Sequence, residues 1–469
     1  MTHSTRLFGL VIVGGGPAGV APLLAAHRMG QLDALLASGV AIVEQSDRLG
    51  SGSIGGYAIN SDSSGRTFVD CLLGENQTEL TRLEEHSLTQ ELAAAGDGAV
   101  SLQDAGRFLG LVGDAICRMV LEHPASAVLT NHRALATHRV QGGWRTQLQD
   151  LMTGQEERTL ASRNLVIATG AHQPPDRLAA EEVGGSKLVD RCADRLLQSG
   201  DVLANGGLER VADLLAGKAL PRVAIIGGST SAAAVAHALL HRLPRVHFGH
   251  GGVTLLHRRE LRIYYPDRAS ALAEGYAEWT EDDVCPISGR VFRFAGFRLD
   301  SRELVMQARG IGGRLPEPRL RLHHVRPEDA EATGIIDQAD LVVAALGYRP
   351  RALPVFGRDG APLTLLAQTG PQTAMVDGQC RILDADSVPI PGLFGIGLAA
   401  GFVPRGALGG EPSFRGQANG LWLWQHDVGS LIIHAISGSS VAPKDETLPR
   451  WDPANVNMPA HLSILAEGA

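Results

Sequence analysis

The stretch LFGLVIVGGGPAG, residues 7–19, decides the fold of the first part of this chain. Its first half is apolar and rich in β-branched side chains, which is typical of a strand buried in a parallel sheet. It then runs into Gly14, Gly16 and Gly19, spaced as GxGxxG, and into a helix rich in alanine and leucine. The first glycine allows a tight turn, the second lets the backbone approach a pyrophosphate, and the third lets helix and strand pack closely. The stretch therefore predicts a dinucleotide-binding βαβ unit.

The residues around these glycines fit the same interpretation. Pro17 and Ala18 would begin the helix, whose free N–H groups and positive dipole end favour a phosphate. Glu44 follows the next expected strand, residues 40–43, where a carboxylate accepts hydrogen bonds from ribose hydroxyls. The spacing from the glycines to this acid exceeds the usual ~20 residues, and residues 31–39 form the insertion that explains it.

A second, less regular turn lies in VAIIGGSTSA, residues 223–232. Serine replaces the second glycine of the pattern and alanine the third, a replacement that such turns accept. The serine adds a side chain where backbone would meet phosphate, although its hydroxyl could itself bind the phosphate. The stretch predicts a second dinucleotide site, with a purely structural turn as the alternative, and its candidate contacts are Gly227, Ser229, Thr230 and Ser231.

The residues after the next strand bear on the choice of nicotinamide cofactor. His257, Arg258 and Arg259 stand where an acidic residue would select NADH. A 2′-phosphate requires cationic donors, and arginine offers a bidentate fork. The pattern favours NADPH over NADH; the alternative is that the arginines form a solvated surface cluster.

Further strands end in small residues where the chain is expected to cross over or approach a cofactor. Thr169 and Gly170 end one apolar strand, Gly347 another, and Gly397 follows a third near the C-terminus. Each of these signals is weak alone, because many α/β folds contain them. We include the four residues among the candidate cofactor contacts.

The chain's length and pattern predict an α/β fold of two Rossmann-like dinucleotide-binding domains with a β-meander insertion. At 469 residues the chain is too long for one growing hydrophobic core. Short strands with turn signals across residues 134–166 form the predicted meander. The expected divisions are a first part of the FAD-binding domain at 1–175, an NAD(P)H-binding domain at 176–340, a second FAD-binding part at 341–436 and an irregular tail at 437–469.

Composition excludes several functions. The formal charge of −8 comes without a basic stripe, so nucleic acid is not an expected partner. No apolar run approaches the ~20 residues of a membrane span, and a strand that starts near residue 8 leaves no room for a signal peptide, so we expect a cytoplasmic protein. The five cysteines are widely spaced, which argues against a CxxC redox pair or a metal cluster. The sequence leaves the oligomeric state open, a homo-oligomer included.

The order of these motifs resembles that of the two-dinucleotide flavoproteins. Residues 223–232 resemble the nicotinamide turn of class B flavin monooxygenases, especially the lysine and ornithine N-hydroxylases. DLVVAALGY, residues 340–348, is similar to their late D-x-x-x-(L/F)-A-T-G-Y signature, with Leu346 in place of the threonine. The resemblance covers roughly residues 7–400. It implies FAD in the first site and NADPH in the second.

The resemblance also implies a reaction. It points to a monooxygenase that acts with dioxygen, through a flavin C4a-hydroperoxide, on a small soft nucleophile, with an amine nitrogen as the leading substrate. Because bound NADP⁺ would protect the oxygenated flavin, no acid–base pair is expected and we predict no catalytic residue. One alternative is an NAD(P)H-dependent reductase of a quinone or other small acceptor, which would share every cofactor motif. Another is a redox-responsive partner-binding flavoprotein.

The substrate pocket is expected where the two cofactor domains meet. A glycine- and serine-rich stretch at residues 50–65 would face the flavin, and a second segment follows the arginine pair. Ordinary loop and packing roles remain the alternative for each. The candidate substrate residues are Tyr57, Asn60 and Ser61, with Asp62 beside them, and Tyr264 and Tyr265, with Asp267 beside them.

Overall fold

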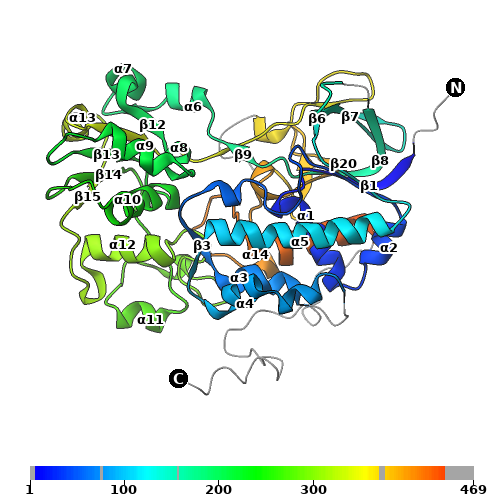
Figure 1. Ribbon diagram of the computed structural model, residues 1–469, viewed down its shortest axis with the longest axis horizontal. Coiled ribbons are helices and arrows are strands. Elements are labelled where there is room, and N and C mark those ends of the chain that lie inside the picture. The colour runs from blue at the N-terminus through cyan, green and yellow to red at the C-terminus, as the bar shows by residue number, and fades with distance from the viewer. Residues whose placement is uncertain (1–5, 74–77, 156–157, 369–374, 439–469) are drawn as a thin grey trace.

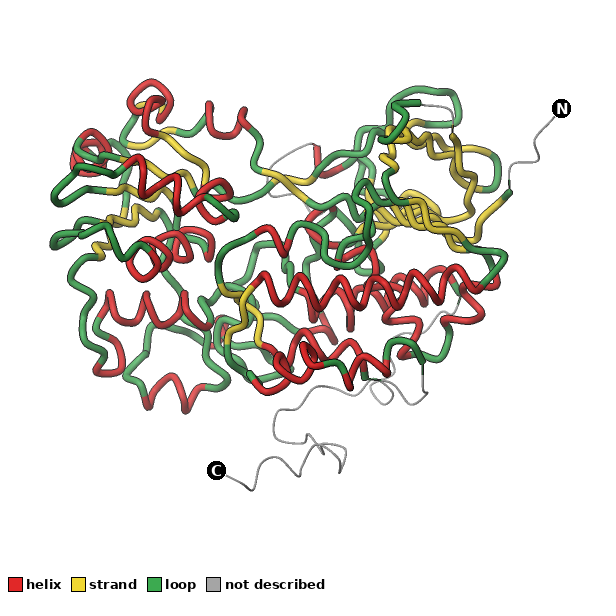
Figure 2. The backbone as a smooth tube through the Cα atoms, in the orientation of Figure 1, coloured by secondary structure: helices red, strands yellow, loops and turns green. Residues whose placement is uncertain are grey.

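The computed structural model describes residues 6–73, 78–155, 158–368 and 375–438 (Figure 1). Two sheets organise the chain, and the strands form two separate groups at opposite ends of the molecule (Figure 2). This is the predicted α/β fold with two Rossmann-like sheets, which is confirmed. The tail predicted for residues 437–469 lies almost entirely outside the described residues.

The first sheet contains the predicted N-terminal dinucleotide unit. Its parallel strands lie in the order β5-β2-β1-β8-β20, and an antiparallel meander of β6 and β7 continues from β8, as the turn signals predicted. The short strand β18 pairs with β6, and β19 pairs with β20. The strands are β1 (Leu7–Val13), β2 (Val40–Val43), β5 (Ala127–Leu129), β6 (His132–Val140), β7 (Gly143–Asp150), β8 (Arg158–Ile167), β18 (Val355–Phe356), β19 (Arg381–Leu383) and β20 (Pro389–Gly395).

Helices cover this sheet and bury an apolar core with it. The insertion at residues 31–39 forms the short helix α2. The C-terminal helix packs along α1. That C-terminal helix begins at Leu421 and contains a π-helical segment. The helices are α1 (Pro17–Arg28), α2 (Leu32–Ala37), α3 (Gly65–Val69), α4 (Ser87–Ala94), α5 (Leu102–Glu122), α14 (Leu421–Leu423), the π segment Trp424–Val428 and α15 (Gly429–Ile436).

The second sheet is entirely parallel, in the order β12-β16-β13-β14-β15. Its central strands are buried on both faces, which explains their uninterrupted apolar sequences. The strands are β12 (Leu196–Gln198), β13 (Val223–Ile226), β14 (Val253–His257), β15 (Leu320–His324) and β16 (Leu341–Ala344). The helices are α6 (Pro175–Ala179), α7 (Leu188–Cys192), α8 (Ser199–Leu203), α9 (Gly207–Leu214), α10 (Thr230–Arg242), α11 (Arg268–Ala273), α12 (Leu299–Arg309) and α13 (Ala330–Asp337).

The position of β16 corrects one predicted boundary. Because β16 pairs with both β12 and β13, a division after residue 340 would remove a central strand from the second sheet. The chain instead crosses between the two units at β9 (Ala171–His172) and β17 (Arg349–Pro350), which pair antiparallel between the two lobes in Figure 1. The predicted boundary placed the crossover between the two units before β16. The crossover instead follows β16, after Gly347.

Among the described residues, no helix combines the length and the apolar character needed to cross a membrane.

Candidate functional site

The first dinucleotide turn has no room for side chains at its first and third glycines. Gly14 has φ of +102°, and a Cβ there would overlap the carbonyl oxygen of Ala168. A Cβ on Gly19 would overlap the carbonyl oxygen of Gly14. A Cβ on Gly16 would meet only Gly52, with its Cα at 3.3 Å. The contact with Gly52 would already be tight for a single Cβ, so a branched side chain at Gly16 would crowd the N-terminus of α1.

Glu44 follows β2 and is directed at this turn. One carboxylate oxygen accepts a hydrogen bond from the backbone N–H of Gly15 at 2.6 Å, and the other accepts from the N–H of Ser46 at 2.8 Å and its hydroxyl at 2.9 Å. The side chain is buried, at 8% exposed. Because two carboxylate oxygens offer about four acceptor positions, capacity remains for a ribose hydroxyl. The arrangement fits the ribose of a dinucleotide.

The other candidate contacts of the first site lie at the same edge of the sheet. The parallel register aligns β1, β8 and β20, so their carboxyl ends lie together. The hydroxyl of Thr169 donates to the carbonyl of Arg351 at 2.7 Å, and Gly170 follows with φ of +72°. A Cβ on Gly397 would lie 2.5 Å from the Cβ of Ala18 in α1. These residues surround the first turn and fit an extended dinucleotide such as FAD.

The second turn is more open than the first. Gly227 has φ of +138°, and a Cβ there would lie 2.5 Å from the carbonyl oxygen of Ala345. Ser229 is the N-cap of α10, is exposed, and its hydroxyl makes no capping hydrogen bond. Thr230 is also exposed and Ser231 is half-buried. Gly347, with φ of +78°, follows the neighbouring strand β16. Hydroxyl and N–H donors are thus free at this helix N-terminus, which fits a phosphate group.

The three residues expected at the nicotinamide ribose have different surroundings. His257 is buried, with Nδ1 2.9 Å from the carbonyl oxygen of Arg259, and its ring stacks on His324 at 5.3 Å. Burial lowers the pKa of His257, which favours the neutral ring. The guanidinium of Arg259 is exposed and makes no ion pair with the residues the structure describes. Among the three, Arg259 is the cation available to a ligand.

Arg258 is held by an acidic segment that the sequence reasoning missed. Its guanidinium forms an ion pair with Glu181 at 2.8 Å and donates a hydrogen bond to the carbonyl of Glu182. Glu181 is buried and also pairs with Arg177 at 2.7 Å. No local sequence signal links residues 181 and 258. The solvated cluster considered as the alternative is therefore in part an ion-pair network.

Three of the predicted substrate residues lie at the junction of the two units. The hydroxyl of Tyr57 is 3.1 Å from that of Tyr348, which follows the second-sheet strand β16. The amide nitrogen of Asn60 donates to Asp300 at 2.8 Å. Ser61 is buried, and its hydroxyl oxygen accepts from the N–H of Ser63 at 2.9 Å.

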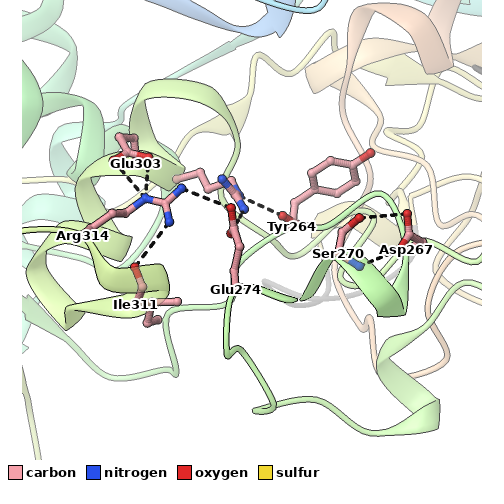
Figure 3. A network of polar contacts seen from close by, with 8 residues as sticks. Tyr264, Asp267, Ser270, Glu274, Glu303, Ile311 and Arg314 are labelled. Carbon is pink, nitrogen blue, oxygen red and sulfur yellow. Dashed lines mark hydrogen bonds and ion pairs between the residues drawn. The ribbon is translucent and has the colours of Figure 1, made fainter. Parts of the chain in front are cut away.

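The other predicted segment has structural contacts instead. Tyr265 is 1% exposed and stacks on Tyr276 at 5.3 Å, so it is not brought to a cleft. Tyr264 accepts a hydrogen bond at its carbonyl from Arg302, in a network that continues to Glu274 (Figure 3). Asp267 caps α11 by accepting from the N–H of Ser270 at 2.7 Å. The structure gives these three residues roles in packing and capping.

A cavity of about 310 Å³ lies between the two dinucleotide units. One wall of the cavity is formed by β3 (Asn60–Ser64). The opposite wall is formed by α10 and the start of α12. Burial raises the pKa of Asp62 in this cavity to about 7; the positive charge of Arg298 opposes this rise and the negative charge of Asp300 adds to it. The sequence reasoning found Asn60, Ser61 and Asp62 but missed the far wall, which includes Ser231, His237 and Asp300.

All five cysteines of the chain are free, and four of them are buried. None of the described cysteines forms a disulfide with another, so this arrangement contains no redox-active dithiol of the CxxC kind.

Comparison with known proteins identifies the family. Residues 8–279 match the pyridine nucleotide-disulphide oxidoreductase family. Over 442 residues, covering 93% of this chain and 98% of the relative, the sequence is 36% identical to the CMP-5′-(3-aminopropyl)phosphonate hydroxylase of Streptomyces rubellomurinus.

Solved structures show the same fold. The cadaverine monooxygenase of Erwinia amylovora superposes with a TM-score of 0.54 at 12% identity, covering 95% of this chain and 99% of that one. The ornithine N-hydroxylase of Kutzneria sp. 744 gives a TM-score of 0.51 at 16% identity, covering 92% and 99%. The chain therefore belongs to the pyridine nucleotide-disulphide oxidoreductase family and, within it, to the class B flavin monooxygenases, which use FAD and NADP(H).

Proposed function

We propose that this monooxygenase N-hydroxylates a primary amine on a small phosphonate- or phosphate-bearing molecule. The observation that carries the proposal is the 36% identity, along 93% of the chain, to a hydroxylase named for CMP-5′-(3-aminopropyl)phosphonate. That compound carries one aliphatic amine. The reaction would be R–NH₂ + O₂ + NADPH + H⁺ giving R–NHOH + NADP⁺ + H₂O.

Nitrogen is favoured over carbon as the oxygenated atom on chemical grounds. An aliphatic amine has a free lone pair when neutral, whereas the cytosine amino group is conjugated with its ring and unactivated C–H bonds are poor nucleophiles. When bound, FAD supplies the redox chemistry, and the protein supplies binding, orientation and exclusion of side reactions. The proposal therefore asks the chain to hold an amine beside its cofactors, not to provide a strong general acid.

We assign FAD to the first turn and NADPH to the second. The open space before Gly16, the backbone N–H groups of α1 and the carboxylate of Glu44 would receive the pyrophosphate and a ribose of FAD. Thr169, Gly170 and Gly397 border the same space. At the second turn, Ser229 and the N–H groups of α10 would bind the pyrophosphate of NADPH, with Thr230, Ser231 and Gly347 beside them.

Arg259 would bind the 2′-phosphate of NADPH. Arg258 would position the loop beside it through Glu181, because its own charge is already paired. His257 would help to shape the 2′-phosphate site by stacking on His324, and it would not supply a charge, since burial disfavours its charged form. In this proposal, the preference for NADPH over NADH depends on Arg259 alone and not on both arginines.

The test is product analysis with the FAD-loaded enzyme, NADPH and CMP-5′-(3-aminopropyl)phosphonate. We expect a product that gains one oxygen atom and reacts as a hydroxylamine, formed in equal amount to the NADPH consumed. The desamino analogue, CMP-5′-propylphosphonate, should yield no oxygenated product. NADPH consumption that ends only in hydrogen peroxide, or in rapid quinone reduction, with no effect of the amine, would contradict the proposal.

A further inference from the structure

The cavity between the two units has a side chain that lacks a partner. Asp62, on β3, lines this cavity, and its carboxylate makes no hydrogen bond or ion pair with any residue in the described part of the chain. Its neighbour Asp300 differs, because it accepts a hydrogen bond from Asn60 at 2.8 Å. Asp62 is half-buried, and a carboxylate that is partly removed from water without a partner is costly; such groups concentrate at functional sites.

The charges around Asp62 make the cavity suited to a cation. From α12 it faces Asp300, and Arg298 lies just before that helix. The positive charge of Arg298 opposes the rise in the pKa of Asp62, but the two side chains form no ion pair; the guanidinium donates to the carbonyl of Arg293 at 2.5 Å and lies over the ring of Tyr264. From α10 come His237, whose pKa burial lowers, and Arg242.

Neither of the two groups on α10 forms an ion pair with Asp62. His237 is favoured in its neutral form, and the guanidinium of Arg242 donates to the carbonyl of Ala58. The structure therefore leaves two carboxylates in the cavity and no cation within ion-pair distance of Asp62 among the described residues.

The cavity also has a fixed relation to the second dinucleotide turn. Thr230, Ser231 and His237 line it from successive turns of α10, beginning at the helix N-terminus. Phosphates of a dinucleotide are attracted to that N-terminus but repelled by the carboxylates farther along the cavity. A cationic group is attracted to the carboxylates, so the cavity accommodates a ligand distinct from the cofactor phosphates.

We propose that this cavity receives the ammonium end of the substrate and that Asp62 is its counter-ion, with the Asn60–Asp300 pair as the adjacent wall. This inference rests on the proposed amine hydroxylation. Asp62 is assigned to substrate binding, and the hydrogen-bonded Asp300 shapes the site beside it.

The test compares two ligands that differ only in the amine. Binding of CMP-5′-(3-aminopropyl)phosphonate and of CMP-5′-propylphosphonate to the oxidised, FAD-loaded enzyme with NADP⁺ is measured by calorimetry. The wild type should prefer the amine, and Asp62→Asn should lose about ten- to a hundredfold of that preference, as expected for a hydrogen bond to a charged group. Glu209→Gln, on the exposed side of α9, removes the same charge elsewhere and should leave the preference unchanged.

Two further measurements separate binding from folding. Burial raises the pKa of Asp62 from 3.8 to about 7 in the folded protein, so the wild type loses stability as pH rises between these two values and the full loss is present at pH 8. Asp62→Asn should therefore be as stable as the wild type or more stable at pH 8. The carboxylate ionises as pH rises through about 7, so the wild-type preference for the amine should increase over that range and the preference of Asp62→Asn should not.

The outcomes distinguish this inference from the proposed function. If a hydroxylamine forms but Asp62→Asn retains the full amine preference, the cavity assignment is overturned and the proposed function stands. If the wild type prefers the amine through Asp62 but no hydroxylamine forms, the proposed function fails and the cavity assignment stands. Weaker NADP⁺ binding by Asp62→Asn with an intact amine preference would assign the cavity to the nicotinamide cofactor and overturn the inference.

Discussion

The two dinucleotide turns of this chain perform related tasks with different residues at matching positions. The first has glycine at all three positions of the pattern, whereas the second has Gly227, Ser229 and Ala232. At the third position a Cβ would overlap backbone in the first turn, yet Ala232 is fully buried without difficulty in the second. Helix α1 therefore packs more closely on its turn than α10 does. The first turn is shaped for close backbone approach, and the second leaves hydroxyl groups free.

The ribose positions differ in the same way. Glu44 is oriented by the turn itself, through the N–H of Gly15 at 2.6 Å. At the matching place in the second unit, His257 is buried and stacked, and Arg259 alone of the two arginines lacks an ion pair among the described residues. Under the proposed assignment, recognition of the cofactor ribose in the first unit is thus built into the motif, whereas recognition in the second depends on residues outside it.

The largest effect is expected at the third position of the first turn, and the matched position of the second turn is its control. Gly19→Ala should prevent accumulation of folded, flavin-loaded protein, because the new Cβ would overlap the carbonyl oxygen of Gly14. The matched change Ala232→Gly should cost only about 1 kcal/mol, the usual penalty for glycine in a helix. Thermal unfolding and soluble yield measure both. Similar losses from the two substitutions would show that the turns are packed alike.

The next effect concerns the second glycine of the first turn. Gly16→Val should leave a folded protein that retains almost no FAD, because the built Cβ meets only Gly52 and the branched side chain would fill the ligand space. Flavin absorbance per mole of folded protein measures the loss. Gly334→Val is the control, since a Cβ on Gly334 in α13, unlike one on Gly16, would meet no atom within 4 Å. If Gly16→Val retained stoichiometric flavin, the first turn would not be part of the FAD site.

The fold could be predicted from the sequence to the extent that its signals are local. Strands such as β1 and β13 are uninterrupted apolar runs that end in a glycine turn, and both lie as expected. The meander of β6, β7 and β8 likewise follows from short strands separated by turn residues. The boundary near residue 340 was wrong because membership of a sheet depends on pairing, and nothing within β16 itself shows that it pairs with β12 and β13.

The candidate site was predictable only on one side. Asn60 and Asp62 belong to a glycine- and serine-rich stretch close in sequence to the first turn, so proximity to the cofactor could be inferred. Asp300 lies in the first turn of α12, a helix that carries no motif, and it reaches the cavity only through tertiary packing. The Arg258–Glu181 ion pair was missed for the same reason, because no periodicity connects the two segments.

A smaller effect should separate the two arginines. Arg259→Ala should raise the KM for NADPH about ten- to a hundredfold and leave that for NADH nearly unchanged, because a charge-assisted bond contributes roughly 1.5–3 kcal/mol. Arg258→Ala should affect both cofactors alike, since it leaves the buried Glu181 with Arg177 as its remaining ion-pair partner among the described residues. Steady-state kinetics with both cofactors make the comparison. If Arg258→Ala raised only the KM for NADPH, we would assign Arg258 to binding of the 2′-phosphate.

The smallest effect tests whether the serine of the second turn acts through its hydroxyl. Ser229 is the N-cap of α10 but its side chain makes no capping bond, so the hydroxyl is free for a phosphate. Ser229→Gly should therefore raise the KM for NADPH by about three- to tenfold, corresponding to the ~0.5–1.5 kcal/mol of one hydrogen bond. Stability should hardly change, because glycine at an N-cap costs only a few tenths of a kcal/mol relative to serine. A lower KM in this variant would mean that the side chain obstructs the phosphate, in which case the second turn is a weakened copy of the first. A higher KM with unchanged melting temperature would establish that hydroxyl recognition replaces the close backbone approach that Gly16 permits in the first turn.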